Sequence, residues 1–441
     1  MKLDENTTQD QRDNQGKNDI QTSCTIPEAI SPVEIESDLD FIISISKRAG
    51  ETFVKCFQCG TCSAVCKNSP DTEPFPRKEM AWANWGMKDA LLSDPDIWLC
   101  YNCNDCSVRC PRDARPSDVL GAIRQETITQ FAFPRFLARW MSQPGCIPLL
   151  LGIPALLLSL ALFLKSPIEN KLGLMPKLDE SIVFSYSSVF PHWLLNSFFI
   201  FFSILALLAV ALGVTKYWQA LKSSRWAIHN SAGNKLSASI ITVLKNIITH
   251  DNFTSCQDNK SRYLSHILIF FGFIALCAVT FWIITSGINP LIHGEFVYPF
   301  NFWSPWKILA NLGGLALIAG CLLMIQQRAK NNGKAGAGSY FDWALITTLL
   351  IVVLTGFMTE VLHYVRLEPH RHLAYFIHLM FVFALLIYLP YSKLAHIFYR
   401  TTAMIYSEYS GRNAAASSIP EKQNSEHQDM ATESQKDGDT Q

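Results

Sequence analysis

CFQCGTCSAVC, residues 56–66, decides what the first folded part of this chain is built around. A second run, CYNCNDCSVRCP at residues 100–111, repeats its cysteine spacing, so both runs contain the pattern C-x2-C-x2-C-x3-C. Three thiolates at this spacing can hold three irons of one cubane, and the fourth cysteine of such a run ligates the neighbouring cluster. The repeated pattern therefore predicts two [4Fe–4S] clusters that exchange their fourth ligands.

The exchange assigns every cysteine of the two runs to a cluster. Cluster 1 is predicted to be held by Cys56, Cys59, Cys62 and Cys110. Cluster 2 is predicted to be held by Cys100, Cys103, Cys106 and Cys66. The alternative is a pair of zinc sites, but zinc usually takes two C-x2-C pairs that are separated by a longer gap. The remaining cysteines are scattered and are interpreted as ordinary thiols: Cys24, Cys146, Cys256, Cys277 and Cys321.

The composition divides the chain into polar ends and an apolar middle. Apolar residues make up 49% of the 441 residues and charged residues only 17%, against roughly 25% charged in a typical soluble domain. The 37 basic and 37 acidic residues cancel, which argues against a nucleic-acid partner. The first 25 residues lack the apolar stretch of a signal peptide, and clustered cysteines in an intracellular chain favour metal over disulfides.

Six apolar windows are long enough to cross a bilayer as helices. They lie at 146–164, 193–214, 264–286, 306–325, 343–362 and 373–397. Segments 76–94 and 116–124 ahead of them have helical spacing and helix-start signals, and no alternating strand pattern appears. The predicted fold class is all-α, with a helical two-cluster ferredoxin domain followed by a six-span transmembrane helix bundle. The predicted order is a disordered tail (1–35), the ferredoxin domain (36–130), an interfacial linker (131–145), the transmembrane domain (146–400) and a second disordered tail (401–441).

Lysine and arginine in the connecting loops indicate the orientation of the bundle. Loop 215–263 carries seven of these residues and loop 326–341 carries three, whereas loop 287–305 has none. Basic loops stay on the cytoplasmic side of a membrane. We therefore expect a multi-pass protein of the cytoplasmic (inner) membrane with both termini and the ferredoxin domain in the cytoplasm.

Ionisable residues inside membrane spans are costly, so they are functional candidates by default. His266 lies in the first turn of the third window and His396 in the last turn of the sixth, so the two should lie at the same depth. Two imidazoles that face each other across a helix bundle suit a bis-histidine haem b. His266 and His396 are therefore the predicted haem ligands.

A second haem is possible because another histidine falls in the sixth window. His378 and His396 are 18 residues apart, about five helical turns, so they should share one face with a rise of about 27 Å. His378 then needs a partner near the outer surface, for which His363 is the first candidate, followed by His293 and His192. The alternative for each single histidine is a packing or interfacial side chain that binds no ligand.

Other chemistry leaves little trace in the sequence. No glycine fingerprint for a nucleotide is visible, so NAD or flavin is not expected on this chain. Glu360 and Lys307 near span ends are possible proton carriers, and solvated end residues are the alternative. No catalytic residue and no quinone site are identified.

Two parts of the chain resemble known families. Residues 76–120, PRKEMAWANWGMKDALLSDPDIWLCYNCNDCSVRCPRDARPSDVL, resemble the helical ferredoxin of the C subunit of heterodisulfide reductases and of the iron–sulfur subunits of fumarate reductases. The segments SRYLSHILIFFGFIALC (261–277), YFDWALITTLLIVVLTGFMTE (340–360) and YFIHLMFVFALLIYLPYSKLAHIF (375–398) resemble the cytochrome b (gamma) subunit of respiratory nitrate reductase.

The second resemblance implies haem b, because in that family two histidines on one span pair with two on the last span. His266, His378 and His396 match three of these positions. The fourth would fall near Leu276, which cannot ligate iron. The resemblance therefore provides a complete ligand pair for one haem, and His378 would have to find another partner for a second.

The order of the two parts resembles the C subunits of the quinone-interacting membrane-bound oxidoreductases of sulfate reducers and related sulfur oxidisers. That resemblance implies electron exchange between menaquinone and cytoplasmic flavin and iron–sulfur partner subunits, which serve adenylylsulfate reductase. One alternative is a membrane subunit of a heterodisulfide- or sulfite-reducing complex, although the chain has no CCG-type cysteine domain of its own. An alternative of another class is a non-redox membrane anchor or transporter with a zinc-binding domain.

Overall fold

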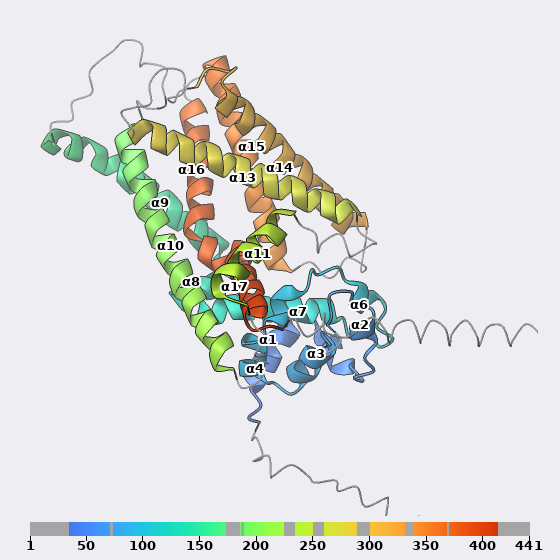
Figure 1. The fold of residues 1–441 in the computed structure, drawn as a ribbon. Coiled ribbons are helices and arrows are strands. Elements are labelled where there is room, and N and C mark those ends of the chain that lie inside the picture. The colour runs from blue at the N-terminus through green and yellow to red at the C-terminus, as the bar shows by residue number, and fades with distance from the viewer. Residues whose placement is uncertain are drawn as a thin grey trace, which may run out of the picture. The chain divides into compact units, whose positions relative to one another are not determined.

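The computed structural model describes residues 35–70, 74–172, 186, 189–224, 234–249, 260–288, 300–330, 339–367 and 370–412. From Ser37 onward these residues belong to one compact unit. Every regular element in these ranges is a helix, so the predicted all-α fold class is confirmed (Figure 1).

Short helices surround the two cysteine runs. They are α1 (Leu39–Ala49), η1 (Glu51–Lys55), α2 (Thr61–Ala64), α3 (Arg77–Asn84), α4 (Lys88–Leu92), α5 (Asp96–Leu99), α6 (Asp105–Val108), α7 (Pro116–Phe131), α8 (Arg135–Met141) and η2 (Pro144–Cys146). Pro116 occupies the first position of α7, where its fixed φ suits the helix and its missing N–H is not needed. The Asp38 carboxylate caps α1 by accepting from the Phe41 N–H at 2.8 Å.

One hydrophobic core joins this N-terminal region to later helices. It contains Ile123 of α7 together with Tyr217 of α10 (His192–Ser223) and Tyr399 of α17 (His396–Tyr409). The Trp98 indole of α5 is 2% exposed and stacks on the Tyr399 ring with centroids 5.6 Å apart. The region that carries the cysteines is therefore packed directly on segments that lie far downstream in the chain.

Six helices are long and apolar enough to cross a membrane, as predicted. Their candidate spans are Pro144–Lys171, His192–Ser223, Arg262–Ser286, Pro305–Lys330, Tyr340–Val365 and His370–Ile387. The helices themselves are α9 (Ile147–Leu172), α10, α13 (Lys260–Ile288), α14 (Pro305–Lys330), α15 (Tyr340–Val365) and α16 (His370–Ile387). A further apolar helix, α11 (Leu236–Thr249), contacts α17 and lies inside a predicted loop; at about 21 Å it is too short to span a bilayer.

Close backbone contact holds α13 against α14. A Cβ atom added to Gly272 would lie 2.7 Å from the Gly313 carbonyl oxygen, and one added to Gly313 would lie 2.9 Å from the Ala275 Cβ. Small residues at such contacts allow the backbones of two membrane helices to approach and gain van der Waals contact. Glycine at both positions is therefore required by the packing of this pair.

The predicted sixth span is wrong at its C-terminal end. The prediction ran one helix through 373–397, but α16 ends at Ile387 and is followed by two 3₁₀ turns, η6 (Leu389–Tyr391) and η7 (Lys393–Ala395). Pro390 explains the break. Proline has no N–H to donate to the helix, its ring clashes with the carbonyl of the preceding turn, and it disfavours helical backbone at the residue before it. The argument that His378 and His396 share one helical face therefore fails, since His396 begins the separate helix α17.

Candidate iron–sulfur and haem-binding sites

The two cysteine runs fold in the same way. Gln58 and Asn102, two residues after the first cysteine of each run, have φ of 57° and 55°. Gly60 and Asn104, two residues further on, have φ of 83° and 74° and stand before the short helices α2 and α6, which contact each other. Left-handed backbone is rare for residues other than glycine and asparagine, so its repetition marks a loop shaped for a ligand.

A serine after the third cysteine anchors each run. The Ser63 hydroxyl accepts from the Arg77 N–H at 3.1 Å, and the Ser107 hydroxyl accepts from the Ser117 N–H at 3.0 Å. Each bond ties a run to the start of the next longer helix, α3 or α7. The cysteine spacing did not point to these serines, although the Cys-Ser pair that both runs contain was a signal for them.

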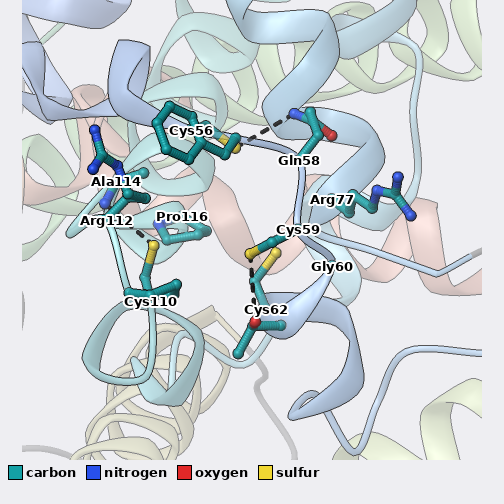
Figure 2. A pocket seen from close by; sticks show the side chains of 13 residues that line it. Cys56, Gln58, Cys59, Gly60, Cys62, Arg77, Cys110, Arg112, Ala114 and Pro116 are labelled. Atoms are coloured by element: carbon teal, nitrogen blue, oxygen red, sulfur yellow. Dashed lines mark hydrogen bonds between the residues drawn. The ribbon is translucent and has the colours of Figure 1, made fainter.

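The side chains predicted to hold cluster 1 lie around one space. Cys56, Cys59, Cys62 and Cys110 line one pocket (Figure 2). Arg112 also lines it and places its guanidinium 4.0 Å from the centre of the Phe57 ring. Three of these cysteines come from the first run and one from the second, which is the exchange that the spacing indicates.

The other predicted set is also close together. Burial raises the pKa of the Cys66 thiol to about 12, and Cys100 and Cys103 add to this effect. Burial also raises the pKa of Cys106, with further contributions from Cys100, Cys103 and Cys66. Cys66 of the first run is therefore near the first three cysteines of the second.

The sulfur atoms are suited to bind a metal rather than to stay as thiolates alone. Burial raises the pKa of Cys62 to about 11, so an ionised sulfur there needs a bound cation. Backbone amides also point at two of the sulfurs, from Asn102 to Cys100 at 3.3 Å and from Ala114 to Cys110 at 3.4 Å. Amide bonds to sulfur and thiolate ligands are typical of iron–sulfur clusters, so the residues fit such a group.

His266 is near enough to His396 for its charge to lower the pKa of His396, although His396 is not on the helix that was predicted. Burial lowers the pKa of His396 to about 3, and the nearby groups Lys393, Arg400 and His266 lower it further. The His396 Nδ1 lies 2.6 Å from the Lys393 carbonyl oxygen, which can only accept, so Nδ1 is the protonated nitrogen. The Nε2 lone pair of His396 is therefore the one available to a metal.

His378 is oriented in the same manner on α16. Its Nδ1 lies 3.1 Å from the Val352 carbonyl oxygen and 3.1 Å from the Thr355 hydroxyl, both on α15. Its proposed partner His363 instead contacts the Tyr186 ring, with centroids 5.3 Å apart, and the Tyr364 ring. Within the described residues, no contact joins the two histidines.

The remaining candidates lie near the ends of helices or outside the described residues. His192 is the first residue of α10, and His293 lies outside the described residues. Lys307 and Glu360, the possible proton carriers, form an ion pair at 3.1 Å, and Asn311 donates to Glu360 at 3.4 Å. These two charges therefore neutralise each other near one end of the bundle.

Comparisons with known proteins agree with this division of the chain. The family described as "Citrate utilization protein B" matches residues 150–417, more than half of the chain. This chain belongs to the citrate utilization protein B family. A second family, the 4Fe-4S dicluster domain, matches residues 52–114, which include all eight cysteines of the two runs.

The relatives of this citrate utilization protein B family member fall into two groups. Citrate utilization protein B of Escherichia coli is 27% identical over 327 residues, covering 70% of this chain and 80% of that protein. The C subunit of the H(2):CoB-CoM heterodisulfide,ferredoxin reductase of Methanothermobacter marburgensis is 38% identical over 89 residues, 20% of this chain and 48% of the relative. A protein of Archaeoglobus profundus that is described as like the C subunit of heterodisulfide reductase is 32% identical over 96 residues, 20% of this chain and 47% of the relative.

The chain spans about half the length of these heterodisulfide reductase relatives. No solved structure matches the chain. The N-terminal region is thus an iron–sulfur ferredoxin domain like that of the C subunit of heterodisulfide reductase, and the chain after it contains six helices that are long and apolar enough to cross a membrane.

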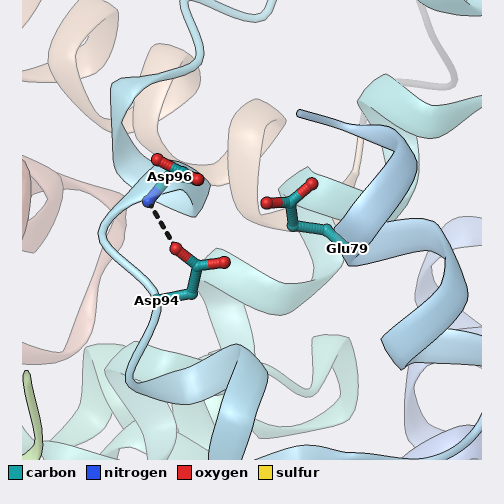
Figure 3. Close-up of side chains that lie close together, drawn as sticks. All are labelled: Glu79, Asp94 and Asp96. Carbon is teal, nitrogen blue, oxygen red and sulfur yellow. Dashed lines mark hydrogen bonds between the residues drawn. The ribbon is translucent and has the colours of Figure 1, made fainter. Parts of the chain in front are cut away.

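The citrate utilization protein B family member also contains a buried acidic cluster that no sequence pattern indicated. Glu79, Asp94 and Asp96 have ligand oxygens within 4.8 Å of one another (Figure 3). Lys78 lies 2.9 Å from Asp96 and 3.1 Å from Asp94, and Arg412 makes a two-pronged pair with Asp96 at 2.5 and 2.6 Å. Burial, followed by Asp94, raises the pKa of Asp96 to about 7. Lys78 and Arg412 stabilise the cluster of carboxylates. The pair with Asp96 also fixes Arg412 to the region just before the second run.

Proposed function

We propose that this chain carries electrons between menaquinone in the membrane and flavin and iron–sulfur partner subunits in the cytoplasm. Two [4Fe–4S] clusters and haem b, when bound, supply sites that accept and release one electron at a time. The observation that carries the proposal is that the two predicted cysteine sets each come together in a region that packs on α17, the helix that begins at His396.

The cysteines would hold the clusters as the spacing predicts. The shared cavity supports Cys56, Cys59, Cys62 and Cys110 as ligands of cluster 1. The mutual effects on pKa support Cys66, Cys100, Cys103 and Cys106 as ligands of cluster 2. The opposing possibility, a zinc domain on a non-redox anchor, is disfavoured by the match to the 4Fe-4S dicluster family.

Haem b would be held by His266 and His396. The proximity of the two rings and the carbonyl that orients His396 support this assignment. The similar orientation of His378 supports a second haem, for which His363 is the candidate partner. In this arrangement the ferredoxin domain and both termini lie in the cytoplasm, as the basic loops indicate.

Three partner systems are candidates. The likeness to the C subunits of quinone-interacting membrane-bound oxidoreductases favours partners that serve adenylylsulfate reductase. The match to citrate utilization protein B over 327 residues favours a redox partner that works in citrate utilization. The heterodisulfide reductase relatives suggest a third setting, a complex related to heterodisulfide reduction, for the ferredoxin domain alone. Co-purification of the full chain from membranes, followed by identification of the bound subunits, separates these systems.

A visible spectrum of the purified full chain tests the redox proposal. We expect a Soret band that sharpens on reduction, a broad iron–sulfur shoulder, and a change of both on adding a menaquinol analogue. We expect His266→Ala to lose the haem bands. His372→Ala, on α16, is the matched control and should keep them. A protein that contains zinc and no reducible chromophore would overturn the proposed function.

A further inference from the structure

Three arginines hold the backbone of the second cysteine run. Arg124 of α7 donates to the Cys100 carbonyl at 2.7 Å and to the Ile97 carbonyl at 2.6 Å. Arg400 of α17 donates to the Cys100 carbonyl at 3.5 Å, and Arg262 of α13 donates to the Cys103 carbonyl at 3.2 Å. The Arg400 guanidinium also lies 4.2 Å from the centre of the Tyr101 ring. The second run is thus bound by positive groups from three different helices.

More positive charge lies beside these arginines. Burial lowers the pKa of Lys393, and the charges of Arg328, Arg124 and Arg262 lower it further, although the Lys393 amine also pairs with Asp342. We call the set of Arg124, Arg262, Arg328, Lys393 and Arg400 the cationic junction. Asp342, which also lies 3.8 Å from Arg328, pairs with two of its members. Asp105 acts on Arg262 as well, so among the described residues two carboxylates face five cations and the junction keeps a positive excess.

The surroundings of the first run are different. The guanidiniums that line its cavity belong to Arg77 and Arg112, and both side chains are exposed. In the first run Cys59 is exposed as well and Cys62 is buried, whereas in the second run both Cys100 and Cys106 are buried. Because charges in water are strongly screened and charges in the protein interior are not, equal charges act more weakly on cluster 1.

The cationic junction also lies beside the histidine pair. Arg262 precedes His266 by four residues in α13, and Arg400 follows His396 by four residues in α17. Residues four apart share one face of a helix, so each arginine lies about one turn from one histidine. Arg262 and Arg400 therefore connect the histidine pair to the second run.

We propose that the cationic junction gives cluster 2 a higher reduction potential than cluster 1, with Arg262 and Arg400 as the positioning residues that set it. The inference rests on the proposed cluster ligands. One-electron reduction adds one negative charge to a cluster and takes up no proton, so the partly buried cations of the junction stabilise the reduced form. Net charge, hydrogen bonding and solvent exposure are the properties that set cluster potentials.

A redox titration of the purified full chain, followed by EPR, tests this proposal. Cys59→Ser and Cys103→Ser assign the two cluster signals. Arg262→Gln and Arg400→Gln should each shift the cluster 2 midpoint to lower potential and leave the cluster 1 midpoint in place. Arg262→Lys, which keeps the charge, should shift it less, and Arg112→Gln is the matched control at cluster 1.

The wild-type chain alone can overturn the proposal, since equal midpoints for the two clusters would contradict it. Unchanged midpoints in both glutamine variants, or equal shifts of both clusters, would also contradict it. Iron analysis separates these outcomes from failure of the proposed function. A chain that carries about eight irons and two signals keeps the redox function even if the arginines have no effect.

Discussion

Replacement of one fourth ligand tests whether the two cysteine runs exchange a sulfur. Cys110 belongs to the second run in sequence, but its side chain lines the cavity that holds Cys56, Cys59 and Cys62. We therefore expect Cys110→Ser to remove or alter the cluster of the first run. The cluster of the second run should remain.

The size of the effect follows from the number of cofactors. Each [4Fe–4S] cluster supplies four irons, so loss of one lowers the iron content from about eight to about four per chain. The Cys110 sulfur accepts a hydrogen bond from the Ala114 N–H at 3.4 Å. Weakening one such bond costs about 1 kcal/mol, which leaves the fold intact and makes the iron loss attributable to the cluster.

The assay combines iron analysis with EPR of the reduced full chain in detergent. Cys66→Ser is the reciprocal variant and should alter the cluster of the second run. Cys146→Ser, a thiol outside both runs, should leave about eight irons in place. The reasoning is refuted if Cys110→Ser abolishes the signal that is lost in Cys103→Ser and keeps the signal that is lost in Cys59→Ser.

The remaining predictions concern stability and packing. Burial raises the pKa of Glu79 well above its ordinary value, so the native state binds this proton more tightly and loses stability as pH rises through that pKa. Glu79→Gln should remove part of that loss, seen as a smaller fall in thermal midpoint as pH rises above about 4.5, the ordinary pKa of a glutamate; an unchanged fall would contradict the assigned cause. Trp98→Ala should cost about 3–5 kcal/mol and lower the thermal midpoint, whereas the exposed Trp85→Ala should not, and equal effects would show that the Trp98 contact is unimportant. Gly272→Leu should force α13 from α14 and reduce folded yield, while Gly152→Leu, at an open position, should be tolerated; equal yields would contradict the close packing.

Much of the fold could be predicted because its signals are local. The cysteine spacing indicated which cysteines lie together, and each apolar window that matches a span is a property of some 20 consecutive residues. The signal for the end of the sixth span was also local, because Pro390 stands in the sequence. A hydropathy window, however, does not detect that proline removes a helical hydrogen bond. Hydropathy alone therefore extended the span through residues that form 3₁₀ turns.

The contacts around the second run could not be predicted in this way. Arg262 and Cys103 are 159 residues apart, and Arg400 and Cys100 are 300 apart. Their spacing carries no periodicity, because the contacts depend on how α13 and α17 pack against the cysteine-bearing region. Arg412 and Asp96, separated by 316 residues, meet for the same reason.

The shared core has a consequence for the order in which the protein is made. Trp98 leaves the ribosome early, but Tyr399, on which it stacks, emerges after all six spans. Domains tend to fold as they are synthesised, N-terminal parts first, yet this one lacks part of its interior until the last helix arrives. We therefore expect the core of the cysteine-bearing domain to be completed only after the membrane segment has been made.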